Sequence, residues 1–174
     1  SSLFDEVEIH TIPTSALIRE VIKIALNEND VVEDPPGSNR GPRIDEYLSS
    51  VNLEPGFPWC AAFVYWCFKK ASAKLHTKNP LVRTASCMQH WDKTKGVKIK
   101  LREAIKNPTL LEPGTIFIID RSEGKGHIGI IISIHGNMIH CIEGNTNTRL
   151  HQVQGVYETW REIKSIDAGF IKYG

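Results

Sequence analysis

The hydrophobic and polar positions divide the chain into a helical first part and a strand-rich last part. Between residues 15 and 29, apolar side chains recur every three or four positions, which predicts an amphipathic helix that the segment Pro13-Thr14-Ser15 can cap. The same spacing predicts a second, shorter helix over residues 43–50. The residues between them, 34–42, are rich in proline, glycine and polar side chains and predict a long loop.

Residues 60–75 form the most apolar of the predicted helices. Its first turns are hydrophobic nearly all round, so we expect it to lie in the core. Pro58 precedes it and suits the start of a helix, because its ring fixes φ near the helical value. Another short helix is predicted over residues 84–95, whereas the basic stretch 93–106 is expected to be a solvated face.

Short runs dense in isoleucine, joined by glycine-containing turns, begin at residue 115. They predict strands at 115–120, 129–135 and 137–142, and two more are predicted at 152–157 and 168–172. Strands that follow helices, rather than alternating with them, indicate an α+β fold. We therefore expect N-terminal helices packed on a C-terminal antiparallel β-sheet.

Length and composition limit the kinds of function that this chain can be expected to have. The 174 residues suit one domain, which we place at 13–174 after an N-terminal arm at 1–12. A net charge of +1 gives no reason to expect a nucleic-acid partner. No apolar run approaches the roughly 20 residues of a membrane span, so none is expected. The sequence also shows no targeting signal that would identify a compartment.

Cys60 is the candidate nucleophile. It falls in the first turn of the apolar helix, where unpaired backbone N–H groups and the helix dipole favour an anion. A thiol in that position has a lowered pKa and is partly thiolate at neutral pH. Among the other cysteines, Cys67 and Cys141 are expected to be buried as small hydrophobic residues. No two cysteines have the C-x-x-C spacing of a zinc site, and their disulfide state stays open.

A thiolate nucleophile needs a base, usually a histidine, and a group that orients the imidazole. Of the seven histidines, His127 is the best candidate, because glycines surround it at the edge of the most hydrophobic strand. His140 is the rival. It alternates with Cys141 along a strand, so only one of these two side chains can face the core.

The orienting group is expected near residue 143. If the strands on either side of Gly136 form a hairpin, His127 lies opposite residues 143–145. Glu143 or Asn145 then lies beside the imidazole, and both can line one site because they share a face of the strand. A carboxylate or an amide there would fix the tautomer of the imidazole. Taken alone, these residues could also be a strand-ending turn.

Four motifs, in this order, resemble the CHAP family of cysteine amidases and endopeptidases, which is related to the NlpC/P60 group. They are Pro-Trp-Cys-Ala-Ala-Phe-Val from residue 58, Pro-Gly-Thr-Ile from 113, Gly-His-Ile-Gly from 126 and Glu-Gly-Asn-Thr from 143. The Asn-Arg-Gly-Pro segment from residue 39 resembles the family's lead-in, and the similarity spans roughly residues 15–150. The resemblance implies a papain-like arrangement of the α+β fold.

By this resemblance, Cys60 is the nucleophile, His127 the base, Glu143 the orienting carboxylate and Asn145 the fourth polar residue. The implied function is cell-wall hydrolysis, as an N-acetylmuramoyl-L-alanine amidase or a peptidoglycan endopeptidase. The implied partner is peptidoglycan, and the implied location is the cell wall, reached by a secreted, periplasmic or delivered protein of bacterial or phage origin. The sequence identifies no immunity protein, secretion apparatus or phage apparatus that would act with it.

Three residues are candidates for substrate binding: Trp59 and Phe57, next to the nucleophile, and Asn39, in the loop 34–42. An aromatic side chain beside a core helix is more often packing. Some CHAP proteins carry an aspartate-rich calcium loop just before the cysteine, but residues 51–59 contain no aspartate. We therefore assign no metal and no cofactor.

Two other functions are compatible with the same fold. One is a cysteine protease or amidase effector that acts on an amide outside peptidoglycan. The other is a catalytically inactive cell-wall-binding module, although such a module would be expected to have lost the cysteine or the histidine. A Cys/His metal protein is the weakest alternative, since the ligand spacings are absent.

Overall fold

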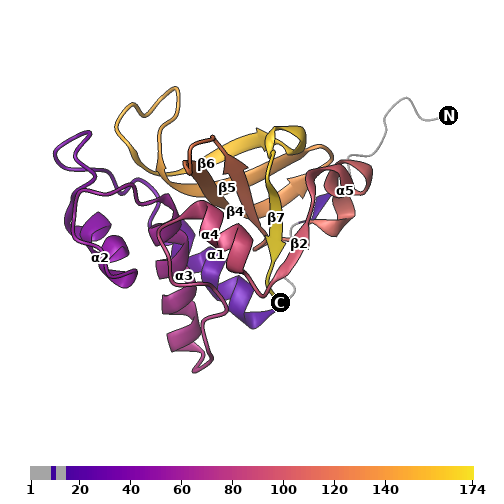
Figure 1. Cartoon of the computed structure of the whole chain (residues 1–174), viewed down its shortest axis with the longest axis horizontal. Helices are drawn as coiled ribbons and strands as arrows, with labels where there is room; N and C mark the ends of the chain where they lie inside the picture. The colour runs from indigo at the N-terminus through magenta and orange to yellow at the C-terminus, as the bar shows by residue number, and fades with distance from the viewer. Residues whose placement is uncertain (1–8, 11–14) are drawn as a thin grey trace.

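The computed structural model describes residues 9–10 and 15–174, with helices from the first part of the chain against a sheet from the last part (Figure 1). The helices are α1 (Ala16–Asn27), α2 (Pro42–Ser50), α3 (Cys60–Lys74), α4 (Cys87–Lys93) and α5 (Leu101–Lys106), with short 3-10 helices η1 (Pro108–Leu110) and η2 (Ile163–Ser165). The strands are β1 (Ile9–His10), β2 (Val97–Ile99), β3 (Ile116–Asp120), β4 (Gly126–His135), β5 (Met138–Thr146), β6 (Gly155–Glu162) and β7 (Gly169–Lys172). The predicted α+β class is confirmed.

The described strands form one sheet in the order β2-β7-β3-β4-β5-β6, and β1 pairs with the end of β4. All of these pairings are antiparallel, as predicted. β4 and β5 form the predicted hairpin, in which His135 pairs with Met138 around Gly136. The register shifts by one residue between Ile131 and Ser133, and this shift changes which residues of β5 lie opposite the first half of β4.

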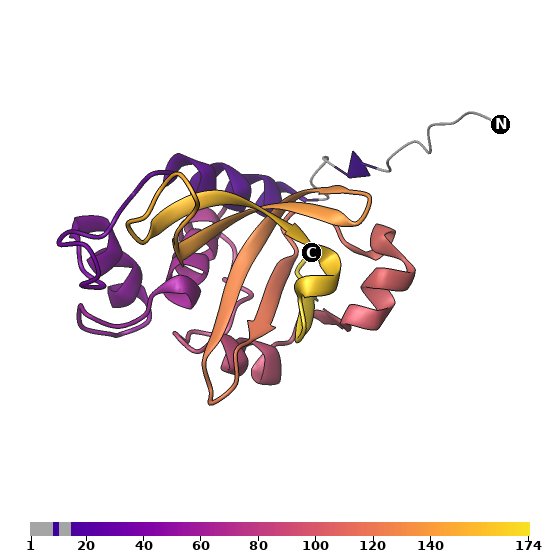
Figure 2. The same ribbon diagram turned by 90° about the horizontal axis from the view of Figure 1, so that it is seen from above.

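The two faces of the sheet are covered by different elements. On one face, α3 packs against β4 and β5, and buried residues of α1 and α2 pack in turn against α3, in which Phe63 is fully buried. On the other face, Phe117 and Phe170 form a second core with residues of α5 and η2. Figure 2 shows α5 on the opposite side of the sheet from α3. Burial of a phenylalanine side chain of this kind contributes about 2–3 kcal/mol to folding.

Two local features explain how the helices reach these positions. The Ser15 side chain accepts a hydrogen bond from the Ile18 N–H at 3.2 Å, which caps α1 as predicted. The second feature is the contact between Gly144 of β5 and Phe63 of α3, where a Cβ atom on Gly144 would lie 2.7 Å from the Phe63 Cβ. Only glycine therefore lets β5 approach α3 this closely, and this approach brings the end of β5 to the start of α3.

Three segments differ from the sequence-based expectation. The stretch 93–106 contains β2 and α5, because Ile99 and Ala104 are buried in the second core and its charged residues flank them. β6 continues to residue 162 instead of ending at 157, since it is an edge strand whose polar side chains can face solvent. Of the expected N-terminal arm, residues 9–10 pair with β4, and the rest lies outside the described residues. No helix in the described part of the chain is long and apolar enough to cross a bilayer.

Candidate active site

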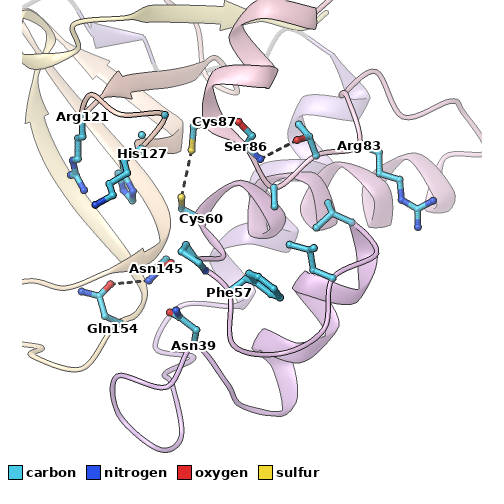
Figure 3. A pocket seen from close by; sticks show the side chains of 18 residues that line it. Asn39, Phe57, Cys60, Arg83, Ser86, Cys87, Arg121, His127, Asn145 and Gln154 are labelled. Atoms are coloured by element: carbon cyan, nitrogen blue, oxygen red, sulfur yellow. Dashed lines mark hydrogen bonds between the residues drawn. The ribbon is translucent and has the colours of Figure 1, made fainter.

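Cys60 lies at the bottom of a cleft of about 960 Å³. It is the first residue of α3, as expected, and its side chain is 7% exposed. Figure 3 shows Cys60 facing His127 and Cys87. Asn39, from the loop before α2, and Phe57, from the loop before α3, lie on another side of Cys60. The remaining walls come from the segment 83–87 and the turn before β4.

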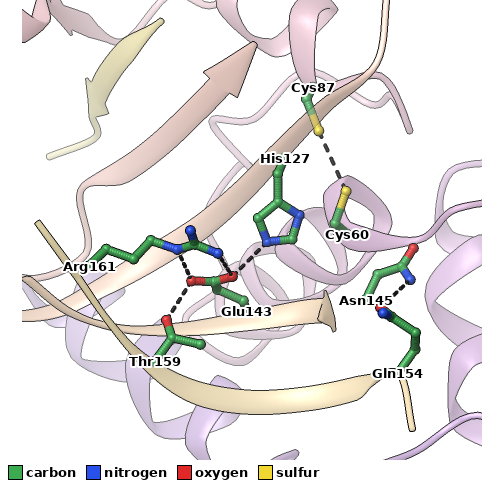
Figure 4. A network of polar contacts seen from close by, with 8 residues as sticks. All are labelled: Cys60, Cys87, His127, Glu143, Asn145, Gln154, Thr159 and Arg161. Carbon is green, nitrogen blue, oxygen red and sulfur yellow. Dashed lines mark hydrogen bonds and ion pairs between the residues drawn. The ribbon is translucent and has the colours of Figure 1, made fainter. Parts of the chain in front are cut away.

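His127 is held by a buried carboxylate. Its Nε2 donates to the Oε1 of Glu143 at 2.6 Å, and both side chains are almost completely buried. The other ring nitrogen, Nδ1, is on the side of Cys60 (Figure 4). The hairpin, with the register shift in β4, therefore brings Glu143 beside the imidazole, and Glu143 is one of the two residues expected there from the sequence. The Glu143 bond leaves Nδ1 available to exchange a proton with the Cys60 sulfur or with a substrate.

Glu143 is in turn held by β6, in a network that the sequence did not reveal. The guanidinium of Arg161 makes two bonds to it, from Nε to Oε2 at 2.6 Å and from Nη2 to Oε1 at 2.7 Å. The hydroxyl of Thr159 donates to Oε2 as well. Arg161 and Thr159 are two residues apart on one face of β6, the face that Glu143 shares on β5. The residue directly opposite Glu143 is Tyr157. The predicted strand stopped at residue 157, so this arrangement could not be assigned from the sequence.

The electrostatics of the network favour an ion pair between Cys60 and His127. Burial alone would lower the pKa of His127, but the bonds and charges of Cys60 and Glu143 outweigh it and raise the pKa to about 9. Burial would raise the pKa of Glu143, yet Arg161 and His127 hold it at about 2. The pKa of Cys60 is lowered well below that of an ordinary thiol, first by its hydrogen bond with Cys87 and then by His127. These shifts all favour the charged forms, with the Cys60 sulfur as a thiolate beside the His127 imidazolium and the Glu143 carboxylate.

Cys87 is a second thiol in the cleft. Its Sγ lies 3.6 Å from the Sγ of Cys60, and both residues line the cleft. The hydrogen bond to Cys60 is the main reason that the pKa of Cys87 is raised, followed by burial. Cys87 therefore stays a thiol and donates to the Cys60 thiolate. Cys87 falls in the predicted helix over residues 84–95 and is buried, but the sequence did not place it beside Cys60.

Asn145 lines the cleft but does not contact the imidazole. Its Oδ1 accepts a hydrogen bond from the backbone N–H of Trp59 at 2.8 Å, and its Nδ2 donates to Gln154 at 3.1 Å. Trp59 is the residue immediately before α3, so Asn145 anchors the helix start that carries Cys60. Asn145 has a φ of 55°, a left-handed conformation that asparagine tolerates better than most residues.

The three candidate substrate-binding residues have different surroundings. Phe57 is 48% exposed and lines the cleft together with Asn39. The expectation that Trp59 forms a groove wall is wrong, because its side chain is fully buried. Its indole N–H donates to Glu33 at 2.9 Å, and its ring stacks on Tyr47 with 5.7 Å between centroids. Trp59 therefore has a packing role.

The rival base, His140, is far from this chemistry. It stacks on Trp160 with 4.8 Å between ring centroids, and its Nε2 lies 3.1 Å from the carboxylate of Glu158. Cys141, next to it, is fully buried in the second core, as expected, and it is therefore the one of these two side chains that faces the core. Cys67 is fully buried as well, and all four cysteines are free thiols. Within residues 9–10 and 15–174, no group of three or more His, Cys, Asp and Glu side chains is arranged to hold a metal ion.

One comparison with known proteins, a match to a protein-family model, covers this site. The family model of the CHAP domain matches residues 52–145, slightly more than half of the chain, and this range includes Cys60, Cys87, His127 and Glu143. A search of curated proteins found no significant match. A solved structure of RipD from Mycobacterium tuberculosis, described as a non-catalytic NlpC/p60 domain protein with an adaptation to peptidoglycan-binding function, is similar over 92% of this chain and 99% of that one. The identity is 14% and the TM-score 0.49, a likeness that carries no argument about activity.

Proposed function

The chain belongs to the CHAP domain family, and from this membership we propose that it is a cysteine hydrolase that cleaves an amide bond of peptidoglycan. It acts either as an N-acetylmuramoyl-L-alanine amidase or as a peptidoglycan endopeptidase. The observation that carries the proposal is the buried series Cys60, His127, Glu143 and Arg161, in which each charged group is held by the next. An inert thiol in a protein core has a raised pKa, as Cys67 does here.

In the proposed reaction, the Cys60 thiolate attacks the carbonyl carbon of the scissile amide. The oxygen that becomes negative is bound by the backbone N–H of Cys60, which no acceptor in the described part of the chain uses. His127 then transfers its Nδ1 proton to the leaving amine, and the acyl group remains on Cys60 as a thioester. A water molecule that His127 deprotonates attacks the thioester and releases the acid.

Each supporting residue has a definite task in this reaction. Glu143 stabilises the imidazolium and fixes the ring so that Nδ1 faces Cys60. Arg161 keeps the Glu143 carboxylate charged and immobile through two bonds. Asn145 positions the first turn of α3 through the Trp59 N–H. Phe57 and Asn39, on the cleft wall, are the residues we propose to contact substrate.

The proposal also covers the setting of the reaction. Residues 13–174 act as one catalytic domain, and the partner is peptidoglycan. The protein works at the cell wall, as a secreted, periplasmic or delivered protein of bacterial or phage origin. The family membership supports the proposed partner and the proposed location.

Digestion of purified peptidoglycan by the wild-type protein and by Cys60→Ala tests the proposal. Mass spectrometry of the released fragments identifies the bond, because an amidase frees the amine of L-Ala and an endopeptidase frees an amine within the peptide. Cys67→Ala is the control, since it removes a buried thiol of the same helix that does not line the cleft. Hydrolysis by Cys60→Ala would refute the mechanism. Cleavage of peptides but not of peptidoglycan would indicate an effector instead, and binding without cleavage would indicate a binding module.

A further inference from the structure

Apart from the Cys60 sulfur, the charged side chains around the cleft are all basic. Arg83, Arg121 and Lys125 line it together with His127, and no aspartate or glutamate is among the lining residues. The chain as a whole is nearly balanced, with 21 Lys and Arg against 20 Asp and Glu. The positive charge of the cleft is therefore a local arrangement and does not follow from the overall composition.

Two of these cations lie together on the turn that leads into β4. The Arg121 N–H donates to the Lys125 carbonyl, and the Lys125 N–H donates to the Ser122 carbonyl, both at 2.9 Å. These bonds close the turn just before His127, the second residue of β4. Figure 3 shows Arg121 on the same side of the cleft as His127. The side chains of Arg121 and Lys125 are exposed, and neither takes part in an ion pair with any described residue.

Arg83 differs from these two because its guanidinium is already bonded. It donates from Nε to the Ser50 carbonyl and from Nη2 to Asn52 Oδ1, both at 2.9 Å. These acceptors are neutral, so the charge of Arg83 still acts on the cleft, but its donors are partly occupied. Arg121 and Lys125 are the cations that are free to bind an anion directly.

The position of this pair relative to His127 indicates which part of a substrate it meets. In the proposed reaction His127 gives its proton to the leaving amine, so the amine fragment lies on the His127 side of the cleft. We propose that Arg121 and Lys125 bind a carboxylate on this amine fragment, and that the enzyme prefers amides whose leaving fragment carries a free carboxylate. An arginine fork matches a carboxylate, and a lysine adds a mobile charge. This inference rests on the proposed function.

Two synthetic peptide substrates that differ only at the end of the leaving fragment provide the test. One ends in a free carboxylate and the other in a carboxamide. The wild-type protein is expected to favour the acid by roughly tenfold in kcat/KM, mainly through KM, because one charge-assisted contact is lost in the amide. The double variant Arg121→Gln/Lys125→Gln is expected to lose most of this preference. Arg102→Gln, on α5 and outside the cleft, removes a similar charge and should retain it.

A binding measurement separates this inference from the proposed function. Titration of Cys60→Ala with the amine fragment, as acid and as carboxamide, measures the preference without hydrolysis. A preference for the acid that disappears in the double variant supports the carboxylate site, even if the wild-type protein cleaves nothing. Equal binding of acid and carboxamide, or a preference that the double variant keeps, overturns it. Added salt is expected to weaken the preference, since both cations are exposed.

A second inference rests on the two sulfurs in the cleft. The 3.6 Å between Cys60 Sγ and Cys87 Sγ exceeds the length of a disulfide bond by roughly 1.5 Å, a gap that small side-chain rotations close. We propose that a peroxide converts this pair into a disulfide, which blocks the nucleophile until a thiol reductant restores it. Cys67 and Cys141 are buried elsewhere in the core and are not expected to take part.

The chemistry balances with one peroxide molecule. The Cys60 thiolate attacks a peroxide oxygen, the O–O bond breaks, and Cys60 becomes a sulfenic acid while hydroxide leaves. Cys87 then attacks the Cys60 sulfur, the S–O bond breaks, and a second hydroxide leaves as the disulfide forms. The proton of the Cys87 thiol and the proton held by His127 convert the two hydroxides into water. Loss of the negative charge on Cys60 also removes the main reason that Cys87 holds its proton.

Treatment with hydrogen peroxide, followed by dithiothreitol, tests the disulfide. Peptide mapping of the oxidised protein is expected to show a Cys60–Cys87 crosslink, and dithiothreitol should restore most of the initial activity. Cys87→Ser, measured against its own initial activity, is expected to oxidise to the sulfinic acid and to recover much less. Absence of the crosslink overturns the inference, as does equal recovery in Cys87→Ser. The crosslink is visible without any hydrolase assay, so this result is independent of the proposed function.

Discussion

Replacement of Glu143 by glutamine is the sharpest test of how the site is assembled. The amide has nearly the same shape as the carboxylate but carries no charge, so the packing of β4 against β5 is preserved. Glu143 and Cys60 together raise the pKa of His127 from 6.5 to about 9, against the opposing effect of burial. That difference is on the order of 3 kcal/mol in favour of the imidazolium.

Without the carboxylate charge, the pKa of His127 should fall, because burial continues to lower it. The basic limb of the kcat/KM profile is therefore expected to move down by about one pH unit or more. At neutral pH, kcat/KM should decrease on the order of 100-fold or more, since the imidazole loses its orienting charge. Steady-state kinetics on a peptide substrate from pH 5 to pH 10 would measure both effects.

The same substitution leaves Arg161 without its counter-ion. The loss of the counter-ion should therefore lower the unfolding free energy by about 2–3 kcal/mol. This is somewhat less than for a fully buried charge, because the Arg161 side chain is 22% exposed. The double variant Glu143→Gln/Arg161→Met is expected to recover much of that stability in urea denaturation but not the original pH profile. A basic limb that stays near pH 9 in Glu143→Gln would refute the role assigned to this carboxylate.

The remaining predictions concern pH and the start of α3. For the wild-type protein, kcat/KM should fall above about pH 9 as His127 loses its proton. It should also fall on the acidic side as Cys60 gains a proton, at a pH below the pKa of an ordinary thiol. Since the folded state lowers the pKa of Glu143 from 4.5 to about 2, its contribution is complete above 4.5. On the order of 3 kcal/mol should then be lost toward pH 2 in chemical denaturation, a loss that the Glu143→Gln variant lacks. Asn145→Ala should reduce the unfolding free energy by about 1–2 kcal/mol, because it frees the Trp59 N–H. Trp59→Phe should cost about 2–4 kcal/mol, because the buried Glu33 carboxylate loses its indole donor, and a cost near zero would contradict that contact.

The sequence by itself determined the elements that carry the chemistry. Local periodicity was sufficient for the helix of Cys60, because Pro58 and an all-apolar run mark both its start and its burial. The hairpin around Gly136 was also readable, but the register shift between Ile131 and Ser133, which the sequence did not reveal, is needed to place His127 on the same face as Glu143. These features depend on residues close together in the chain or on a single turn.

The tertiary structure decided the contacts between distant segments. Asn145 bonds the Trp59 N–H across 86 positions of sequence, a pairing that depends on how closely β5 approaches α3 at Gly144. Arg161 could not be linked to Glu143 beforehand, because polar residues on an edge strand carry little hydrophobic periodicity. Cys87 meets Cys60 only because α4 packs over the end of the β3–β4 hairpin. Periodicity reports which face of an element is buried, whereas the partner of a buried charge or thiol is set by packing between elements.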